Sequence, residues 1–369
     1  MSMSRGRTGR RRVVSRSTHT NHVTRPGKKV LGVKDTVSSN IKVINYTPQA
    51  DTGGQCYRLC RKVNRNYPNY DCKSFIGKYN YIHYPADYVY SKSVKADPYV
   101  KKFWADASVL HGHIHLRGLR AWPSLNPKAG RIVHQHGRLP RGSLTYKDRA
   151  EIWAEDEKVK ATRVVSTINL LRYIPDKDGK DIVDKSRRWF PTPVDIKWLQ
   201  NFHARSARRK STDTVRVMHS PTDRGLKHTG LFLKCMKRLS RKYDVEAVLV
   251  ENRTHEDTQI IRAGCDIVYD QILLQYGSNA LEAWAMGIPV IAGCIDDPAV
   301  LSDIKSVVGY VPFLNADKES LYDALERLVI DTRTRTQYAR MGHHYVNKFH
   351  SGKAVAKRAV ETYEEVMRR

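Results

Sequence analysis

Short apolar stretches alternate with amphipathic stretches of helical length from Val215 onward, and this alternation restricts the fold more than any other feature. A strand followed by a helix and then by another strand, repeated several times, is typical of a doubly wound parallel sheet. The turn after the first of these strands lacks the Gly-x-Gly-x-x-Gly pattern that binds dinucleotides, which disfavours a hydride-transfer enzyme. The predicted strands are residues 215–220, 245–251, 266–270, 288–292 and 307–311, and the predicted helices are residues 228–242, 255–263, 279–286 and 317–330.

The segment from Gly277 to Gly293 carries the clearest binding signal. Gly277 allows a backbone turn to approach a ligand closely, and Ser278 is a good N-cap for the helix predicted to follow. Glu282 then lies in the first turns of that helix, near the positive end of its dipole. An anion such as a diphosphate suits the helix end, and a neighbouring carboxylate suits sugar hydroxyl groups. The alternative is that Glu282 is an ordinary surface residue of a βα unit.

This segment also resembles a known signature. Residues Leu281–Ala292 follow a Gly and read Leu-Glu-Ala-Trp-Ala-Met-Gly-Ile-Pro-Val-Ile-Ala, which resembles the donor site of GT-B glycosyltransferases, particularly the large retaining group called family four. The resemblance implies an α/β protein with two Rossmann-like, doubly wound domains facing a cleft, in which Glu282 holds the ribose of a nucleotide sugar. The family usually carries a second Glu where this chain has Leu274, and Asp270 or Gln271 is a candidate to replace its contact with the sugar. The residues implied to lie near the diphosphate are Gly277, Ser278, Asn279 and Ala280.

Two cations follow the first predicted strand of the second half. Arg224 and Lys227 lie on a loop leading into a helix, where they are placed to neutralise a diphosphate leaving group. The loop resembles the family's donor loop, in which an Arg precedes a Lys-Gly pair. His228 replaces the usual Gly, and the spacing from Arg to Lys is shorter than usual, so Lys227 matches the pattern better than Arg224 does.

The first half begins with a predicted strand at residues 42–46, a loop at residues 51–54 and a predicted helix at residues 55–65. A Gly-Gly pair between a strand and a helix lets backbone amides meet a ligand, although such a pair is usually only a turn. In GT-B enzymes a loop at this place closes on the reacting groups, so the resemblance makes Gly53 and Gly54 candidates. A group of tyrosines is predicted either to stack on sugar or base rings or, as the favoured alternative, to serve as packing groups, namely Tyr79, Tyr81, Tyr84, Tyr88 and Tyr90.

Two further predicted strands, residues 108–113 and 131–137, end in histidines. His111 and His113 share a face of their strand, and with His115 they look superficially like the zinc motif of metallohydrolases. The Asp-His pair of that motif is missing and no carboxylate cluster stands nearby, so we expect no metal. The His-x-His-Gly pattern at residues 134–137 resembles family-four enzymes instead, which places His136 beside the transferred sugar.

The connection between the two halves is also similar to that family. Trp189–Asp195 resembles its Pro-x-Pro-Val-Asp segment, and two prolines favour an extended, stiff hinge. Residues 203–212 are predicted to be a basic loop, and the amphipathic residues 353–367 a final helix, which by the resemblance crosses back to the first domain. The expected organisation is a basic disordered arm at 1–40, an acceptor-side domain at 41–190, a linker at 191–214, a nucleotide-sugar-binding domain at 215–350 and the crossing helix at 351–369.

The charge of the chain points to a polyanionic partner. The net charge is +28, and residues 1–40 account for only +9 of it, with ten Lys or Arg residues and one acid. Nucleic acid, an anionic membrane face and an acidic polysaccharide are the partners that such a charge favours, while a generally cationic host proteome is the alternative. Six cysteines without a Cys-x-x-Cys pair fit free thiols in the cytoplasm, and no apolar run is long enough to span a membrane.

The resulting hypothesis is a retaining, metal-independent glycosyltransferase without a cofactor. Lys227, Arg224 and the helix amides would stabilise the leaving diphosphate, while His136 would position the sugar. A hydroxylated base in DNA is the favoured acceptor, and a lipid-linked or cell-wall glycan at an anionic membrane is the competing one. A non-catalytic nucleic-acid-binding protein and a metallohydrolase are alternatives from other classes. The sugar, the nucleotide and the oligomeric state stay open.

Overall fold

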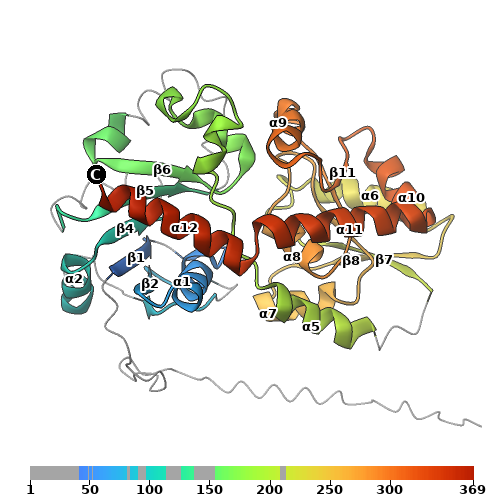
Figure 1. Ribbon diagram of the computed structural model, residues 1–369. Helices are drawn as coiled ribbons and strands as arrows, with labels where there is room; N and C mark the ends of the chain where they lie inside the picture. The colour runs from blue at the N-terminus through green and yellow to red at the C-terminus, as the bar shows by residue number, and fades with distance from the viewer. Residues whose placement is uncertain are drawn as a thin grey trace, which may run out of the picture. The chain divides into compact units, whose positions relative to one another are not determined.

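Figure 1 shows a computed structural model of the chain, which describes residues 41–48, 50–51, 53–80, 84–89, 97–113, 126–136, 154–207 and 213–369. The expected basic arm therefore lies outside the described residues. So do Tyr81, Tyr90, His115 and residues 208–212 of the expected basic loop.

A parallel sheet forms the centre of the N-terminal lobe, the name used here for residues 41–190 together with the last helix of the chain. Its strand order in the described residues is β3-β2-β1-β4-β5-β6. The order changes direction at β1, so the loops after β1 and β4 diverge at the carboxyl edge of the sheet and leave a crevice between them. The strands are β1 (Ile41–Thr47), β2 (Tyr70–Ile76), β3 (Tyr88–Val89), β4 (Val109–Gly112), β5 (Gly130–Gln135) and β6 (Ala161–Val165).

Two helices from opposite ends of the chain pack together on this sheet (Figure 1), namely α1 (Gln55–Asn66) and α12 (Gly352–Met367). The apolar stripe of α12, with Val355 and Tyr363 fully buried, completes a core cluster that also contains Val43 and Leu59. The expectation that the final helix returns to the first domain is thus confirmed. Further helical segments among the described residues of the lobe are α2 (Pro98–Ala105), η2 (Ile168–Tyr173), η3 (Asp176–Asp178), η4 (Asp184–Arg188) and a short helical stretch at residues 154–158.

A second parallel sheet forms the centre of the C-terminal lobe, residues 196–350. Its order in the described residues is β11-β10-β9-β7-β8, with β7 between β8 and β9. The loops after β7 and β9 therefore diverge at the carboxyl edge and frame a second crevice. Together the two sheets confirm the predicted α/β fold. The strands are β7 (Val215–His219), β8 (Val245–Leu249), β9 (Ile267–Gln271), β10 (Val290–Ala292) and β11 (Leu314–Asn315).

Four helices of this lobe, α6, α7, α8 and α10, match the predicted ones, and the structure differs from the prediction in two regions. The predicted strand at residues 307–311 is wrong, because Val307 and Val308 belong to α9 and Gly309 ends that helix in the left-handed conformation, at φ 97°. Residues 203–207, predicted as loop, form the end of α5 instead. The helices are α5 (Ile196–Ala207), α6 (Thr229–Leu239), α7 (His255–Arg262), α8 (Ser278–Ala285), α9 (Ala299–Val308), α10 (Leu321–Ile330) and α11 (Thr332–Phe349).

The chain passes between the lobes twice, and the two passages are hydrogen-bonded to each other. The first passage is the extended segment before α5, and the second is the junction of α11 and α12. The amide of Val194 donates to the carbonyl of His350 at 3.0 Å, and His350 Nδ1 lies 2.8 Å from the carbonyl of Thr192. The imidazole is fully buried there, with 1% of its surface exposed.

The close packing of α8 on α11 depends on Gly342. A Cβ added at this position would overlap the ring of Trp284, which is itself fully buried. We expect Gly342→Ala to lower the free energy of unfolding by about 1–3 kcal/mol through overpacking. The matched control is Gly230→Ala on α6, where a Cβ would meet nothing within 4 Å, so chemical denaturation should show no loss of stability. Equal effects of the two substitutions would contradict this account.

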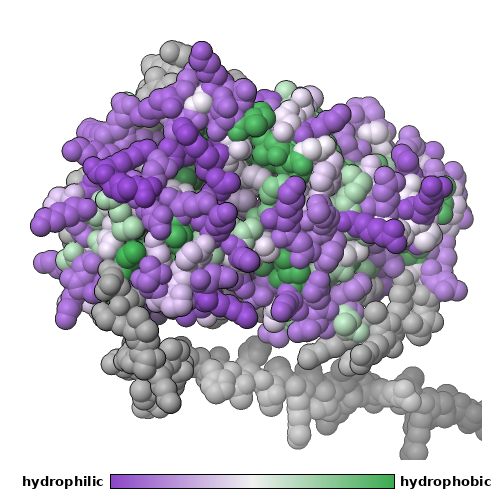
Figure 2. Space-filling view, in the orientation of Figure 1, coloured by the Kyte–Doolittle hydropathy of each residue, from purple (hydrophilic) through white to green (hydrophobic). Residues whose placement is uncertain are grey.

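Hydrophilic residues cover most of the face shown in Figure 2, with apolar residues in separate patches. Among the described residues, no helix combines the length and the apolar character needed to cross a bilayer. All six cysteines are buried and unpaired, as the sequence predicts.

Candidate functional site

A cavity of about 360 Å³ lies where the carboxyl edges of the two sheets meet, and we call it the interlobe cavity. The N-terminal lobe contributes residues that follow β1 and β5, and the C-terminal lobe contributes the loops after β7, β8 and β9 together with the start of α8. This is the place where open α/β sheets bind ligands. Predicted site residues that line it are Gly53, His136, Lys227, Gly277, Ser278, Asn279 and Glu282.

Glu282 is the most strongly held side chain of the cavity. It is buried, with 4% of its surface exposed, and both oxygens of its carboxylate already accept hydrogen bonds. Oε1 lies 2.7 Å from His255 Nε2 and 3.4 Å from an Arg58 nitrogen. Oε2 accepts from Gln259 at 2.8 Å and from Arg262 at 2.9 Å. Burial opposes ionisation, but Arg262, His255 and Arg58 outweigh it and hold the pKa of Glu282 well below its usual range.

Three of these partners come from α7 and were not predicted. His255, Gln259 and Arg262 are spaced i, i+4 and i+7, so they share one face of the helix. Thr254 caps α7 by accepting from the amide of Asp257 at 3.2 Å. The sequence alone shows this spacing. Polar and charged residues that recur where a helix normally carries its buried apolar residues indicate that the helix packs against a charged partner.

The fourth partner, Arg58, comes from the N-terminal lobe. It reaches Glu282 from α1, and its guanidinium lies 5.1 Å from the centre of the Tyr84 ring. Tyr84 is 8% exposed and lies 4.8 Å from the His255 ring, measured between centroids. Tyr84 therefore lines the cavity as part of a cluster with two groups that bind Glu282, whereas Tyr79 is 40% exposed and outside it.

The start of α8 forms an anion-binding region that a side chain of the protein now occupies. Asp270, at the end of β9, accepts from the amide of Gly277 at 2.5 Å and from Lys227 Nζ at 3.3 Å. Gly277, not Ser278, is the N-cap of α8, and Ser278 is the first residue of the helix. The amides of Ser278 and Asn279 belong to the first turn, whose N–H groups have no acceptor within the helix.

Several predicted residues lie elsewhere. Ala280 is fully buried and its amide donates to the carbonyl of Gly277 at 3.1 Å, so that amide does not face the cavity. Arg224 is exposed and forms an ion pair with Glu251 at 2.5 Å, outside the lining. Gln271 also lies outside it and donates to the carbonyl of Leu274 at 3.2 Å. Of the two candidates to replace a Glu at position 274, Asp270 is the one in the cavity.

The Gly-Gly loop is held in place by its neighbours. Gly54 adopts the left-handed conformation (φ 63°), and a Cβ there would lie 2.6 Å from the Tyr84 ring, so only glycine fits. Asp51 accepts from the amide of Gln55 at 2.8 Å, which ties the loop to the start of α1. Burial raises the pKa of Asp51 to about 6, although the hydrogen bonds of the helix amides oppose this rise. Gly53 lines the cavity, whereas Gly54 does not line it and packs against the Tyr84 ring.

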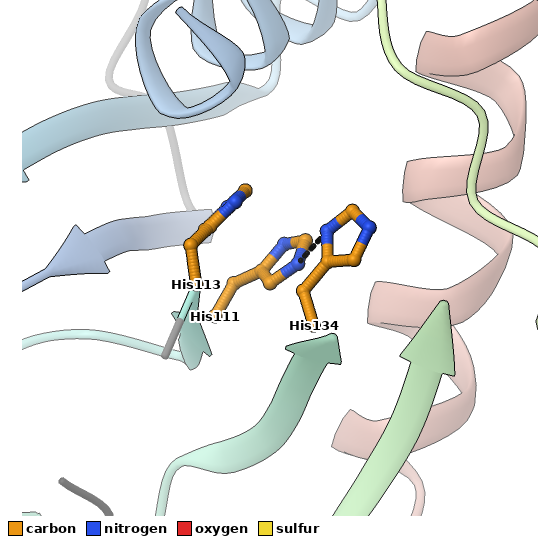
Figure 3. A group of neighbouring side chains, drawn as sticks. All are labelled: His111, His113 and His134. Carbon is orange, nitrogen blue, oxygen red and sulfur yellow. Dashed lines mark hydrogen bonds between the residues drawn. The ribbon is translucent and has the colours of Figure 1, made fainter. Parts of the chain in front are cut away.

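Four histidines at the ends of β4 and β5 form a stacked cluster, three of which Figure 3 shows. One nitrogen each of His111, His113 and His134 lie within 4.8 Å of one another. His111 Nε2 faces His134 Nδ1 at 3.1 Å, the dashed line of Figure 3, and His111 Nδ1 faces the Tyr363 hydroxyl at 3.1 Å. A metal ion bound by all three would have to displace such hydrogen bonds.

His136, at the edge of the cavity, receives a defined tautomer from this cluster. His113 Nε2 lies 2.8 Å from Asn45 Oδ1, an atom that can only accept, so His113 carries its proton on Nε2. His113 Nδ1 must then accept from His136 Nε2, at 2.8 Å. Burial lowers the pKa of His113 well below its usual range, so this arrangement holds in the neutral state. His136 Nε2 therefore carries the proton of this hydrogen bond.

The tautomers can be measured by nitrogen NMR of protein with labelled histidine. We expect the Nε2–H form for His113 and His136, and the Nδ1–H form for His219, whose Nδ1 lies 3.1 Å from the carbonyl of Tyr269. His219 therefore serves as an internal reference for the other tautomer. Asn45→Leu should remove the preference of His113 for the Nε2–H tautomer. It should also lower the free energy of unfolding by about 1–3 kcal/mol, because the buried N–H of His113 loses its acceptor. An Nδ1–H signal for His113 in the unchanged protein would disprove the relay.

Comparisons with solved structures find the same overall fold in other proteins. No protein-family model matches the chain, and no curated protein matches its sequence. Among solved structures, the Anabaena protein HepE in complex with UDP-glucose is similar over 88% of this chain and 100% of its own, with a TM-score of 0.61 and 12% identity. Sucrose-phosphate synthase from Thermosynechococcus elongatus is similar over 89% of this chain and 99% of its own, with a TM-score of 0.59 and 14% identity.

A third similar structure is an alpha-glucosyltransferase in complex with UDP and a 13-mer DNA containing a central A:G mismatch. It covers 88% of this chain and 100% of its own, with a TM-score of 0.51 and 9% identity. At such identities the likeness shows the fold. The architecture of this chain, with two parallel sheets and an interlobe cavity, is that of the GT-B glycosyltransferases.

Proposed function

We propose that the protein transfers a sugar from a nucleotide-diphosphate sugar to an acceptor hydroxyl group, with retention of configuration and without a metal ion. The observation that carries the proposal is the meeting of Lys227, the first turn of α8 and the buried carboxylate of Glu282 in one interlobe cavity. A cation and free helix amides suit a diphosphate, and a fixed carboxylate suits the hydroxyl groups of a ribose.

The diphosphate would take the region that Asp270 now fills. Lys227 Nζ and the amides of Ser278 and Asn279 would donate hydrogen bonds to its oxygens. They would stabilise the negative charge that develops as the bond between the sugar and the diphosphate breaks. At Glu282 the weakest of the four existing contacts is the one to Arg58, at 3.4 Å. A ribose hydroxyl that donates to Oε1 would replace this contact without disturbing Arg262. In this proposal the leaving phosphate accepts the acceptor's proton, and His136 positions the transferred sugar.

Metal independence has its own support in the charges of the cavity. The three acidic side chains among its described lining residues are Glu251, Asp270 and Glu282. Each is already paired with a cation, namely Arg224, Lys227 and Arg262 respectively. Hard divalent cations bind groups of carboxylates with free oxygens, and these carboxylates are separately neutralised. Fixed cations would take over the role that a metal plays at a diphosphate.

For the acceptor, we propose a hydroxylated base in DNA. The net charge of +28 favours a polyanion, and a protein of similar fold was solved together with DNA. The base would be flipped or unpaired so that its hydroxyl group reaches the interlobe cavity. Six buried, unpaired cysteines support a reducing compartment, and we therefore place the reaction in the cytoplasm.

The test is nucleotide release from UDP-, GDP- and ADP-sugars, with and without DNA that carries hydroxymethylated bases. We expect release that this DNA stimulates and that is at least a hundredfold weaker in Lys227→Ala. The matched variant is Lys242→Ala, which removes a lysine that also pairs with an acid, Glu326, but outside the cavity, and it should leave the release unchanged. Release unaffected by DNA would move the acceptor to a lipid-linked or cell-wall glycan. No turnover with any donor, together with salt-sensitive DNA binding, would leave a non-catalytic nucleic-acid-binding protein.

A further inference from the structure

The helix that starts beside the interlobe cavity carries a row of exposed cations. Lys227 lines the cavity, and α6 begins two residues later, at Thr229. One side of α6 packs into the core of the C-terminal lobe, and the cations lie on its exposed side. We call them the α6 stripe, and its members are Lys234, Lys237, Arg238 and, in the turn that follows the helix, Arg241.

No acid balances these charges within the helix. α6 contains no Asp or Glu, and among the described residues Lys234, Lys237 and Arg241 form no ion pair. The members follow one another at spacings of three and four residues, where like charges destabilise a helix. The negative end of the helix dipole offsets this cost for the cations of the last turn, but Lys234 lies before that turn. Because a solvated helix face normally carries both signs, the stripe indicates a partner of opposite charge.

Two neighbouring contacts show which cations are available to such a partner. The guanidinium of Arg238 lies 3.9 Å from the centre of the Tyr322 ring, a contact that fixes its position and leaves its charge in place. Lys242 lies next to the stripe but is paired with Glu326 at 3.6 Å, so it is not a member. Arg238 thus adds a guanidinium in a fixed place to the three unpaired cations.

The length and charge of the stripe suit one strand of duplex DNA. From Lys234 to Arg241 the stripe spans about 10 Å along the helix axis. One strand of a duplex carries a phosphate every 3.4 Å or so of its axis, so about three phosphates cover the same length. The four cations of the stripe therefore meet a similar number of negative charges.

We propose that the α6 stripe binds the phosphate backbone of the DNA whose base enters the interlobe cavity. This inference rests on the proposed function, which supplies the identity of the polyanion. The stripe lies about 8–18 Å along the helix axis from Thr229, the residue that starts α6 beside the cavity. One turn of duplex is about 34 Å long, so the duplex on one side of a flipped base is long enough to reach the stripe. Phosphate contacts carry no sequence information, so they would hold the duplex and leave the choice of base to the cavity.

An anionic membrane is a less suitable partner for this helix. Helices that lie on bilayers insert the apolar side chains of one face and present cations on the other. The apolar residues of α6 are used inside the protein, where Phe232, Met236 and Leu239 are buried in the core. The stripe therefore offers charge alone, which suits sequence-independent contacts with the phosphates of a duplex.

The test is the salt dependence of binding to an unmodified duplex of about 20 base pairs, measured by fluorescence anisotropy with the full-length protein and no donor. The variant carries Lys234→Gln, Lys237→Gln and Arg241→Gln, which retains the contact of Arg238. The slope of log K against log salt should become less steep by about 1 for each cation removed, or about 3 in total. Binding at about 100 mM salt should weaken roughly a hundredfold. The midpoint of chemical denaturation should not fall, because the substitutions remove like-charge repulsion.

The matched control carries Lys197→Gln, Lys305→Gln and Lys348→Gln, which removes the same charge from three other helices of the same lobe. Its slope and affinity should stay close to those of the unchanged protein. Equal losses in the two triple variants would show an effect of net charge alone and would overturn the inference, as would an unchanged slope in the α6 variant. Vesicles of equal parts phosphatidylserine and phosphatidylcholine are the third probe. Binding to them that depends on the stripe, without binding to the duplex, would overturn it as well.

Kinetics separate this inference from the proposed function. With a hydroxymethylated duplex as the acceptor, the α6 variant should raise the KM for the duplex at least tenfold and leave kcat unchanged, which is the result expected when binding alone is weakened. The KM for the donor should not change, since the stripe lies outside the interlobe cavity. No turnover by the unchanged protein with any donor would count against the proposed function, whereas the salt dependence of duplex binding would still decide the role of the stripe.

Discussion

Replacing Glu282 with alanine is expected to lower the free energy of unfolding by about 3–5 kcal/mol, besides abolishing donor binding. The reason is what the substitution leaves behind. Arg262 is 1% exposed and His255 and Arg58 are largely buried, so removal of the carboxylate strands cationic groups and donors without their acceptor. Chemical denaturation of both proteins at pH 7 measures the difference.

Two further variants show whether the buried network is responsible. Glu282→Gln keeps the shape but removes the charge, and should fall between the unchanged protein and Glu282→Ala. Glu251→Ala removes an acid from an exposed ion pair with Arg224 and should change stability little. The sign with pH follows from the depressed pKa of Glu282: its contribution is fully present above the usual value of 4.5 and is lost as the pH falls toward the folded-state pKa. Similar losses for Glu282→Ala and Glu251→Ala would contradict the network.

The second large effect expected is a steep loss of stability as the pH falls below 6.5. Burial lowers the pKa of His111 to about 3, and those of His113 and His134 well below the usual 6.5. Below pH 6.5 these three imidazoles therefore bind protons in the unfolded chain but stay neutral in the folded protein. Each such group removes about 1.4 kcal/mol per pH unit, so the three together remove about 4 kcal/mol per unit between pH 6 and 4.

Other buried groups change the loss of unfolding free energy per pH unit, each in a direction set by its pKa. Burial also lowers the pKa of His219 and of His350 to about 4, so both add to the loss. Asp51 acts in the opposite sense, because its pKa is raised to about 6 and the folded protein binds its proton first. Urea denaturation at half-unit steps from pH 7.5 to 4.5 gives the slope. His134→Phe should reduce it by about one proton, whereas a flat profile down to pH 5 would refute the prediction.

The fold was more predictable than the site. Alternating apolar stretches after Val215 gave the second sheet because parallel strands and their helices have distinct lengths and periods. The error at residues 307–311 arose because a β-branched pair, the half-buried Val307 and the buried Val308, ends α9, where packing outweighs strand preference. In the site, Lys227 and Glu282 were found because they lie in local motifs.

The missed groups depend on contacts that no local pattern carries. His350 is held by the carbonyl of Thr192, which lies more than a hundred residues earlier along the chain. Arg58 is similar, since its role depends on the approach of α1 to α8 across the cavity. Only the spacing of His255, Gln259 and Arg262 on α7 was available in advance.

The return of α12 to the N-terminal lobe has a consequence for synthesis of the chain. Val43 and Leu59 emerge early from the ribosome, but Val355 and Tyr363, which cover them, are among the last residues made. At about 5–20 residues per second, the interval between β6 and α12 is roughly 10–40 s. Throughout that time the first sheet lacks the helix that completes its core, so the C-terminal lobe is expected to complete its own core first.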